Sequence, residues 1–372
     1  MPIQRPSWLP DYIPELQGLR GIAVLMVVVY HCHPRLEGTP FNYASLWGWA
    51  GVNLFFVLSG FLITSILLET RDAPHYFRNF YGRRALRIWP VYVLVIAICA
   101  LFPDWFLNQG IEAFRHAGAW VACALLIQNL FHLALPSAIG PTWSLAIEEQ
   151  YYLLWAPVVR LLKTPAALAS ALALAITGSP LVRLSHFGWL TPTHTLIHLD
   201  GIAWGSLLAL GLHTLPLSRR AWTLLGFAGL VAGLTAAASI AGGTAFLDSA
   251  LAVAFAGAVL AAIASTSGVR GDGSSPRGWS TVARNPVNAL LGRGPLAFYG
   301  RISYGLYMTH IMVFIYFGWF DRKMDRFGTA GSLAVVAWRL ALSTAAATVL
   351  WYGFESRILR LKRYFAARSS RP

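Results

Sequence analysis

An arginine and a histidine share the first long apolar stretch of the sequence. Arg20 and His31 lie eleven positions apart in it. On an α-helix, eleven residues make about three turns and rise about 16 Å, so both side chains lie on nearly one face. An ionisable side chain inside a membrane helix is costly to insert and indicates a functional site. Imidazole accepts protons near neutral pH, whereas a guanidinium stays charged and needs an anion or water. The alternative is that the two residues only mark the helix ends.

Two adjacent carboxylates interrupt a later apolar run. Glu148 and Glu149 follow Trp143-Ser-Leu-Ala-Ile. They are about 100° apart on a helix, so they cannot both face one site. One is suited to hydrogen-bond a histidine while the other braces a neighbouring helix. A purely structural pair is the alternative interpretation.

Three arginines precede the third apolar run. Arg83, Arg84 and Arg87 are spaced so that they can share one helix face. Guanidinium groups bind phosphates through paired hydrogen bonds. The alternative is a topology signal that touches anionic lipid headgroups.

Further polar residues stand near the ends of apolar runs and are candidates to line a substrate cavity. Ser303, Tyr307 and His310 share a face by their spacing, although His310 could equally be a satisfied core histidine. For Asn53 and Ser59 the alternative role is helix packing. For Asp200 the alternative is a structural ion pair. The whole candidate set comprises Asn53, Ser59, Glu149, Tyr152, Asp200, Ser303, Tyr307 and His310.

The composition excludes most soluble protein classes. Of 372 residues, 56% are hydrophobic and 12% charged, and the mean hydropathy is +0.56. This indicates a polytopic membrane protein. The net charge of +14 comes from basic residues scattered through short loops, which argues for topology signals rather than nucleic-acid binding. The three cysteines have no metal-binding or disulfide pattern, and we expect no metal.

Eleven apolar runs could cross a membrane, and loop charge selects among them. The runs are near 17–33, 49–69, 87–103, 118–135, 142–160, 165–181, 196–213, 221–240, 245–265, 297–319 and 330–354. An even number of spans puts the basic loop at 266–295 and the basic tail at 357–372 inside, as the positive-inside rule prefers. We therefore predict an all-α bundle of about ten transmembrane helices in a single domain over 1–372. Both termini are expected in the cytoplasm, with a re-entrant or partial helix near 118–135.

Five motifs along the chain carry a resemblance to a known family. They are Leu16-Gln-Gly-Leu-Arg-Gly with ten residues between Arg20 and His31, Gly51-Val-Asn-Leu-Phe-Phe-Val-Leu-Ser-Gly-Phe, the Arg83, Arg84 and Arg87 cluster, Trp143-Ser-Leu-Ala-Ile-Glu-Glu-Gln-Tyr-Tyr-Leu, and Ile302-Ser-Tyr-Gly-Leu-Tyr-Met-Thr-His. Together they resemble acyltransferase family 3, the bacterial membrane O-acyltransferases of glycans, lipids and macrolides. The resemblance covers a core of about 13–363, and the chain resembles the stand-alone form without an SGNH domain. One departure is His198, where many relatives carry arginine.

The resemblance implies transfer of an acyl group, usually acetyl, from acyl-CoA to a hydroxyl group in the bacterial inner membrane. We predict His31 as the base and Glu148 as the carboxylate that orients it. A covalent acyl-histidine relay is the alternative. The three clustered arginines are expected to hold the coenzyme phosphates, and Arg20 a phosphate or carboxylate. The acceptor would be a glycan or glycolipid, or next a macrolide-type natural product, with membrane lipids as further partners.

Two other classes compete with an enzyme. A transporter or flippase of glycan or lipid intermediates also contains buried charges, but typically with internal repeats, and no repeat is visible here. A membrane scaffold would not need Arg20 or His31.

Overall fold

The computed structural model consists of helices and turns, and it contains no strand in the residues that it describes: 5–10, 12–106, 117–131, 133, 135–185, 190–240, 245–265 and 288–365. Long helices coincide with ten of the predicted runs. They are α1 (Glu15–His31), α4 (Ala50–Glu69), α5 (Tyr76–Leu101), α9 (Thr142–Leu161), α10 (Pro165–Leu184), α11 (Leu199–Thr214), α12 (Arg219–Ile240), α13 (Leu247–Ser265), α14 (Gly294–Tyr316) and α16 (Gly328–Leu350). The all-α membrane fold is thereby confirmed. The count of ten spans stays a prediction, because six of the described helical segments are both long and apolar enough to cross a membrane.

Shorter elements connect these helices. They are α2 (His33–Leu36), α3 (Asn42–Leu46), η1 (Trp47–Trp49), α6 (Pro103–Phe106), α8 (Ala117–Ala124), η2 (Gln128–Leu130), η3 (Thr195–Ile197), η6 (Asn288–Gly292), α15 (Gly318–Met324), η7 (Asp325–Phe327), η8 (Trp351–Glu355), α17 (Ser356–Leu359) and η9 (Arg360–Phe365). Of the predicted loop at 266–295, residues 266–287 lie outside the described residues.

The partial helix expected near 118–135 is confirmed. α8 has 8 residues and is followed by the short turn η2. A hydrogen bond from α9 replaces a missing helical one: Nε2 of Gln150 donates to the backbone carbonyl of Leu126 at 2.8 Å. The same nitrogen donates to the side-chain Oδ1 of Asn129, also at 2.8 Å. Every buried backbone group needs such a partner at membrane depth.

The third long helix begins earlier than its apolar run predicts. α5 starts at Tyr76, whereas the run starts near 87. The preceding residue, His75, has a left-handed backbone with φ of 55°, which ends any earlier helix. Tyr76 and Phe80, four positions apart, are buried on one face. The stretch is therefore amphipathic, and hydropathy alone misses it.

The chain forms two compact units. Unit 1 contains Met1–Leu25, Ala50–Glu69 and Tyr151–Arg301. Unit 2 contains Met26–Trp49, Thr70–Gln150 and Ile302–Pro372. Because the boundaries fall inside α1, α9 and α14, each of these helices contributes a part to both units.

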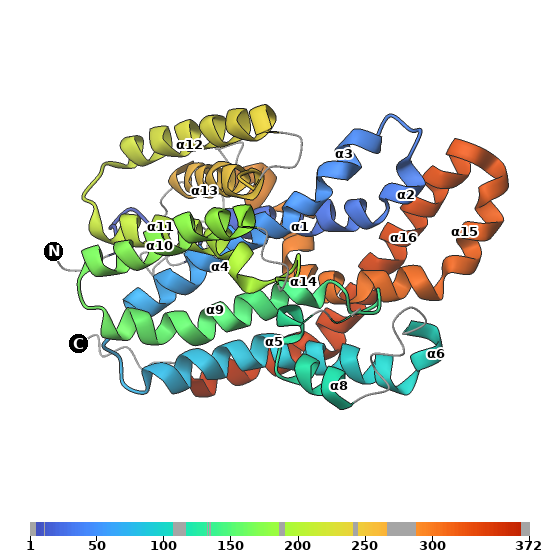
Figure 1. Ribbon diagram of the computed structural model, residues 1–372, viewed down its shortest axis with the longest axis horizontal. Coiled ribbons are helices and arrows are strands. Elements are labelled where there is room, and N and C mark those ends of the chain that lie inside the picture. Colours follow the sequence, from blue (N-terminus) through green and yellow to red (C-terminus); the bar gives the residue numbers. More distant parts are fainter. Residues whose placement is uncertain are drawn as a thin grey trace, which may run out of the picture. The chain divides into compact units, whose positions relative to one another are not determined.

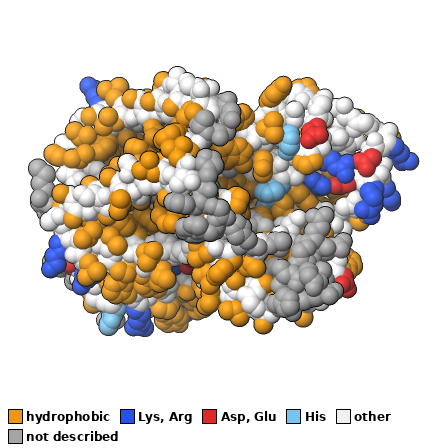
Figure 2. Space-filling model, viewed as in Figure 1, with side chains coloured by type: hydrophobic (Ala, Val, Ile, Leu, Met, Phe, Trp, Pro, Cys, Tyr) orange, Lys and Arg blue, Asp and Glu red, His pale blue; other side chains and the backbone are white. Residues whose placement is uncertain are grey.

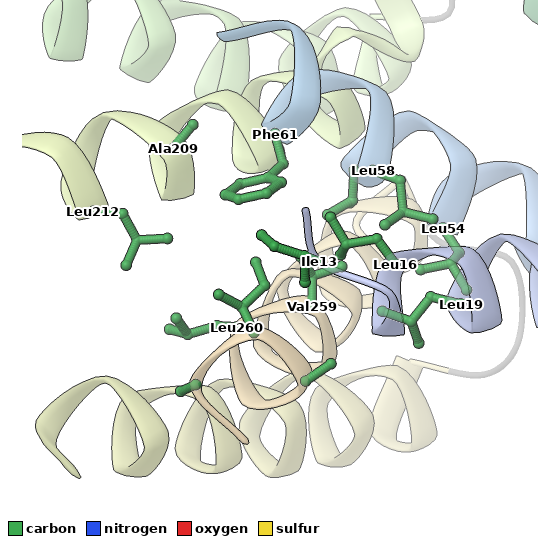
Figure 3. Close-up of a cluster of buried hydrophobic side chains, with 14 of the residues drawn as sticks. Ile13, Leu16, Leu19, Leu54, Leu58, Phe61, Ala209, Leu212, Val259 and Leu260 are labelled. Atoms are coloured by element: carbon green, nitrogen blue, oxygen red, sulfur yellow. The ribbon is translucent and has the colours of Figure 1, made fainter. Parts of the chain in front are cut away.

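In unit 1, α12 pairs with α13, and α11 packs against α4 and α10 (Figure 1). α11 approaches α4 closely at Gly60 and Gly205, where an added Cβ would collide with the backbone of the facing helix. Apolar side chains fill the centre of the unit (Figure 3). Those labelled there are Ile13, Leu16, Leu19, Leu54, Leu58, Phe61, Ala209, Leu212, Val259 and Leu260.

In unit 2, α15 and α16 pack against one another (Figure 1), and charged residues join them to α2. Arg35 pairs with Asp325, and its Nη2 lies 3.5 Å from Asp321. Arg339, in the middle of α16, also pairs with Asp321. This network fixes the segment that directly follows His31.

Apolar side chains also cover much of the face shown in Figure 2. Leu154, Leu174 and Val349 are 68%, 74% and 73% exposed on α9, α10 and α16. A soluble protein rarely exposes so many large apolar side chains, and contact with lipid explains their exposure.

Candidate functional site

Two histidines meet in unit 2. Nε2 of His310, on α14, lies 3.2 Å from Nδ1 of His31, at the end of α1. The ring centroids are 4.9 Å apart and the ring planes meet at 61°. His310 is fully buried, whereas His31 is only partly buried. The two residues are 279 positions apart, and folding makes them direct neighbours.

Backbone carbonyls determine which ring nitrogens carry the protons. Nδ1 of His310 lies 2.8 Å from Tyr307 O and 3.1 Å from Leu306 O, and Nδ1 of His31 lies 2.9 Å from Val27 O. A carbonyl oxygen only accepts, so each Nδ1 must donate. Nε2 of His310 then accepts from Nδ1–H of His31. The remaining nitrogen, Nε2 of His31, keeps a lone pair and has no hydrogen-bond partner among the described residues.

A tyrosine connects this pair to α9. The hydroxyl of Tyr307 donates to Pro141 O at 2.9 Å and lies 2.6 Å from Oγ of Ser144. Tyr307 also faces the ring of His310, with centroids 6.1 Å apart. Ser144 is one turn before Glu148, which interacts electrostatically with Tyr307. Of the predicted residues, the structure therefore brings His31, His310, Tyr307 and Glu148 into one region of unit 2.

The orientation of His31 differs from the triad-like expectation. The partners of its Nδ1 are Val27 O and His310, so a histidine lies where the sequence analysis placed a carboxylate. A contact between Glu148 and His31 stays a prediction. Ser303 lies on the same helix as His310 and is fully buried.

The three arginines of α5 have different surroundings. Nη1 of Arg87 pairs with Oε1 of Glu355 at 2.5 Å, and its guanidinium lies over the rings of Tyr304 and Trp351. Arg84 interacts electrostatically with Glu149. Nε of Arg83 donates to Phe365 O at 2.9 Å. Glu355 is not among the residues predicted from the sequence, although its position directly after the apolar run at 330–354 was a usable signal.

The remaining candidates belong to unit 1. Arg20 and Ser59 are partly buried on α1 and α4, and Tyr152 is buried on α9. Nδ2 of Asn53 donates to Oδ1 of Asp248 at 3.1 Å.

Asp200 pairs with an arginine that the sequence analysis did not consider. Nη2 of Arg183 lies 2.7 Å from Oδ2 of Asp200, and Ser249 donates to the same oxygen at 2.5 Å. Arg183 also lies 3.8 Å from Asp248, so the network reaches Asn53. The predicted span ended at 181, which excluded Arg183 from the helix. An arginine so close to an apolar run was nevertheless a signal.

The described residues contain no group of three or more His, Cys, Asp or Glu side chains that could hold a metal ion.

Residues 13–354 match the profile of the acyltransferase family described as "Acyltransferase domain". The chain belongs to this family. It carries this acyltransferase domain, and its long apolar helices make it an integral membrane protein.

Several curated proteins resemble part of this acyltransferase. It is 36% identical to YrhL of Bacillus subtilis (strain 168) over 181 residues, which cover 44% of this chain and 27% of YrhL. It is 35% identical to the peptidoglycan O-acetyltransferase OatA of Listeria monocytogenes over 156 residues, 39% of this chain and 24% of that protein. It is 33% identical to the O-acetyltransferase OatA of Staphylococcus aureus (strain NCTC 8325) over 165 residues, 41% of this chain and 26% of that protein. The acyltransferase thus spans about a quarter of the length of these relatives. No solved structure matches it.

Proposed function

We propose that this acyltransferase moves an acetyl group from acetyl-CoA to a hydroxyl group of a glycan, with His31 as the general base. The observation that carries the proposal is the open Nε2 of His31. Its other ring nitrogen is held by Val27 O and His310, so the tautomer leaves a basic lone pair on the partly exposed imidazole.

The proposed reaction is a direct transfer. Nε2 of His31 takes the proton of the acceptor hydroxyl while the oxygen attacks the thioester carbonyl of the donor. The tetrahedral intermediate collapses, the carbon–sulfur bond breaks, and the coenzyme thiolate leaves and takes the proton back. The products are the O-acetyl ester and the free thiol.

His310 acts in this scheme as a positioning residue. Protonation of Nε2 makes His31 an imidazolium whose Nδ1–H donates more strongly. Its acceptors, Val27 O and Nε2 of His310, are in place beforehand. Preorganised dipoles of this kind stabilise charge that develops during a reaction. Glu148 belongs to the same region, because it interacts electrostatically with Tyr307, which neighbours the ring of His310.

Donor binding is assigned to the arginines of α5. Arg83 and Arg84 are the first choices for the coenzyme phosphates, with Arg87 beside them, and Arg20 is assigned to a phosphate or carboxylate. With both termini in the cytoplasm, α5 begins on the side where acyl-CoA is made, and His31 lies about 16 Å from the level of Arg20 by helical rise. The inner membrane of a bacterium is the compartment that fits.

The acceptor class rests on the relatives. Listeria OatA is a peptidoglycan O-acetyltransferase by name, and this favours a peptidoglycan-type glycan. A glycolipid or a macrolide-type natural product is the alternative acceptor. Membership of an acyltransferase family favours transfer over the transporter alternative.

The test uses the purified full chain in detergent with acetyl-CoA and soluble peptidoglycan fragments. We expect free thiol and acetylated glycan to form in equal amounts, as measured by a thiol reagent and by mass spectrometry. Thiol release without an acetylated product, or no consumption of acetyl-CoA with any hydroxyl acceptor, would contradict the proposal.

A further inference from the structure

The C-terminal segment of the described chain, residues 356–365, packs on the beginning of α5. Both elements belong to unit 2, and η9 contacts α5 (Figure 1). Phe365 is the centre of this contact. Its carbonyl accepts from Nε of Arg83 at 2.9 Å, and the guanidinium of Arg78 lies 5.9 Å from its ring centroid.

A glycine makes room for the phenylalanine. A Cβ at position 82 would collide with ring atoms of Phe365, so the ring would have to move to admit one. Gly82 costs helix stability, because glycine is about 1 kcal/mol less favourable than alanine inside a helix. The seat for Phe365 is the compensating contact that the structure offers for this glycine.

The two elements carry charge of one sign. Residues 76–88 contain Arg78, Arg83, Arg84 and Arg87, and residues 356–365 contain Arg357, Arg360, Lys362 and Arg363, whereas neither stretch contains an acid. Glu355 neutralises Arg87, and Glu149 acts on Arg84. Arg78, Arg357 and Arg360 have no ion-pair partner among the described residues.

One hydrogen bond orients the side chain of Arg83, and no acidic residue in the described part of the chain forms an ion pair with it. Phe365 O is its hydrogen-bond partner among the described residues and uses only Nε. The two terminal nitrogens, which form the fork that grips phosphate, are left for a ligand. Like charges on two elements that contact one another repel each other, and a polyvalent anion bound between the elements would remove that cost.

We propose that residues 356–365 form the second wall of a phosphate-binding site whose first wall is the beginning of α5, and that the ligand is the phosphate-bearing nucleotide end of coenzyme A. The assignment rests on the proposed function, which supplies a coenzyme A donor. Phe365 in its seat on Gly82 holds the two walls together and fixes Arg83. Arg78 and Arg83 contribute from α5, and Arg360 and Arg363 from η9.

The first test measures binding of coenzyme A to the purified full chain in uncharged nanodiscs at low salt, by titration calorimetry. Arg360→Gln combined with Arg363→Gln is the test variant. Lys163→Gln combined with Arg220→Gln is the matched control, because it removes two exposed cations from unit 1. We expect the test variant to bind coenzyme A about tenfold more weakly, the scale of two lost exposed ion pairs, and the control to bind within twofold of the wild type.

Two further ligands separate the possible sources of phosphate. Dephospho-coenzyme A lacks one phosphate and should lose less affinity in the test variant than coenzyme A does. Vesicles of phosphatidylglycerol test lipid headgroups. If the test variant loses vesicle binding but keeps its coenzyme A affinity, the surface is a lipid contact and the inference is wrong. If the wild-type chain does not bind coenzyme A at all, the donor assignment of the proposed function fails instead.

A double-mutant cycle tests the contact between Phe365 and Gly82. Gly82→Ala displaces Phe365, and Phe365→Ala removes it. We expect each to weaken coenzyme A binding by a similar factor, and the double variant to be no weaker than Phe365→Ala alone. Independent, multiplying effects, or no effect of either change, would show that the seat does not organise the site.

Discussion

The polar network around Asp200 in unit 1 has its hydrogen-bonding groups satisfied, whereas the histidine pair of unit 2 leaves one nitrogen open. Asp200 receives two hydrogen bonds from Arg183 and one from Ser249, and its own N–H lies 3.3 Å from Oγ of Ser179. In His31, Nδ1 is hydrogen-bonded to Val27 O and to His310, whereas Nε2 has no hydrogen-bond partner among the described residues. A saturated network holds helices together, while an unsatisfied lone pair on a partly exposed ring can take a proton from a substrate.

The largest structural effect is expected from breaking the unit 1 network. Arg183→Ala leaves Asp200 buried without its cation, and removal of one partner of a buried ion pair costs about 3–5 kcal/mol. We expect a large fall in the midpoint of thermal unfolding in detergent, with turnover per folded molecule little changed. Arg220→Ala, at an exposed position, serves as the control. An unfolding midpoint like that of the wild type would mean that the network does not stabilise unit 1.

The positioning role of His310 predicts a different pattern. His310→Ala removes the acceptor from Nδ1–H of His31 but leaves Val27 O in place, so we expect kcat to fall about 10- to 100-fold and KM to change little. Initial rates at saturating acetyl-CoA and over a range of acceptor concentrations measure the two constants. A rise in KM with unchanged kcat would assign His310 to substrate binding instead.

The arginines of α5 show the same contrast between a paired and an unpaired polar group within one helix. Arg87 is paired with the buried Glu355, whereas the terminal nitrogens of Arg83 have no partner among the described residues. We expect Arg83→Ala to weaken coenzyme A binding about tenfold without lowering the unfolding midpoint, and Arg87→Ala to lower both. Arg87→Lys should also be impaired, because a lysine cannot form the same fork. Equal effects of Arg83→Ala and Arg87→Ala on both measurements would remove the distinction.

The smallest effect is expected at Tyr307. Tyr307→Phe removes the bonds to Ser144 and Pro141 but keeps the ring beside His310. One such hydrogen bond contributes about 1 kcal/mol, so we expect a modest loss of stability and a fall in turnover of less than tenfold. The midpoint of thermal unfolding and kcat should both fall slightly in this variant. A much larger loss of turnover alone would mean that the hydroxyl contacts the substrate.

Much of the fold follows from the sequence because hydrophobic run length and the cost of buried charge are local properties. The ten long helices and the partial helix near 118–135 are visible in this way. The beginning of α5 is not, because its arginines hide an amphipathic helix. The family motifs likewise identify Arg20, His31 and Glu148 as candidates.

What the sequence does not contain is pairing between distant positions. Glu355 with Arg87, Arg183 with Asp200, and His310 with His31 depend on how helices pack, and no spacing rule connects residues so far apart. The tautomer of His31 was also beyond reach, since it depends on carbonyls and a partner that only the fold supplies.

The central claim is that His31 is the base, and turnover of the His31→Ala variant tests it most directly. The matched control is His33→Ala, two positions away, whose imidazole contacts Ser45 and Glu37 instead. With acetyl-CoA and peptidoglycan fragments, we predict a loss of about 100- to 10,000-fold for His31→Ala at an unchanged unfolding midpoint, and near-normal turnover for His33→Ala. Near-normal transfer by folded His31→Ala would contradict the account.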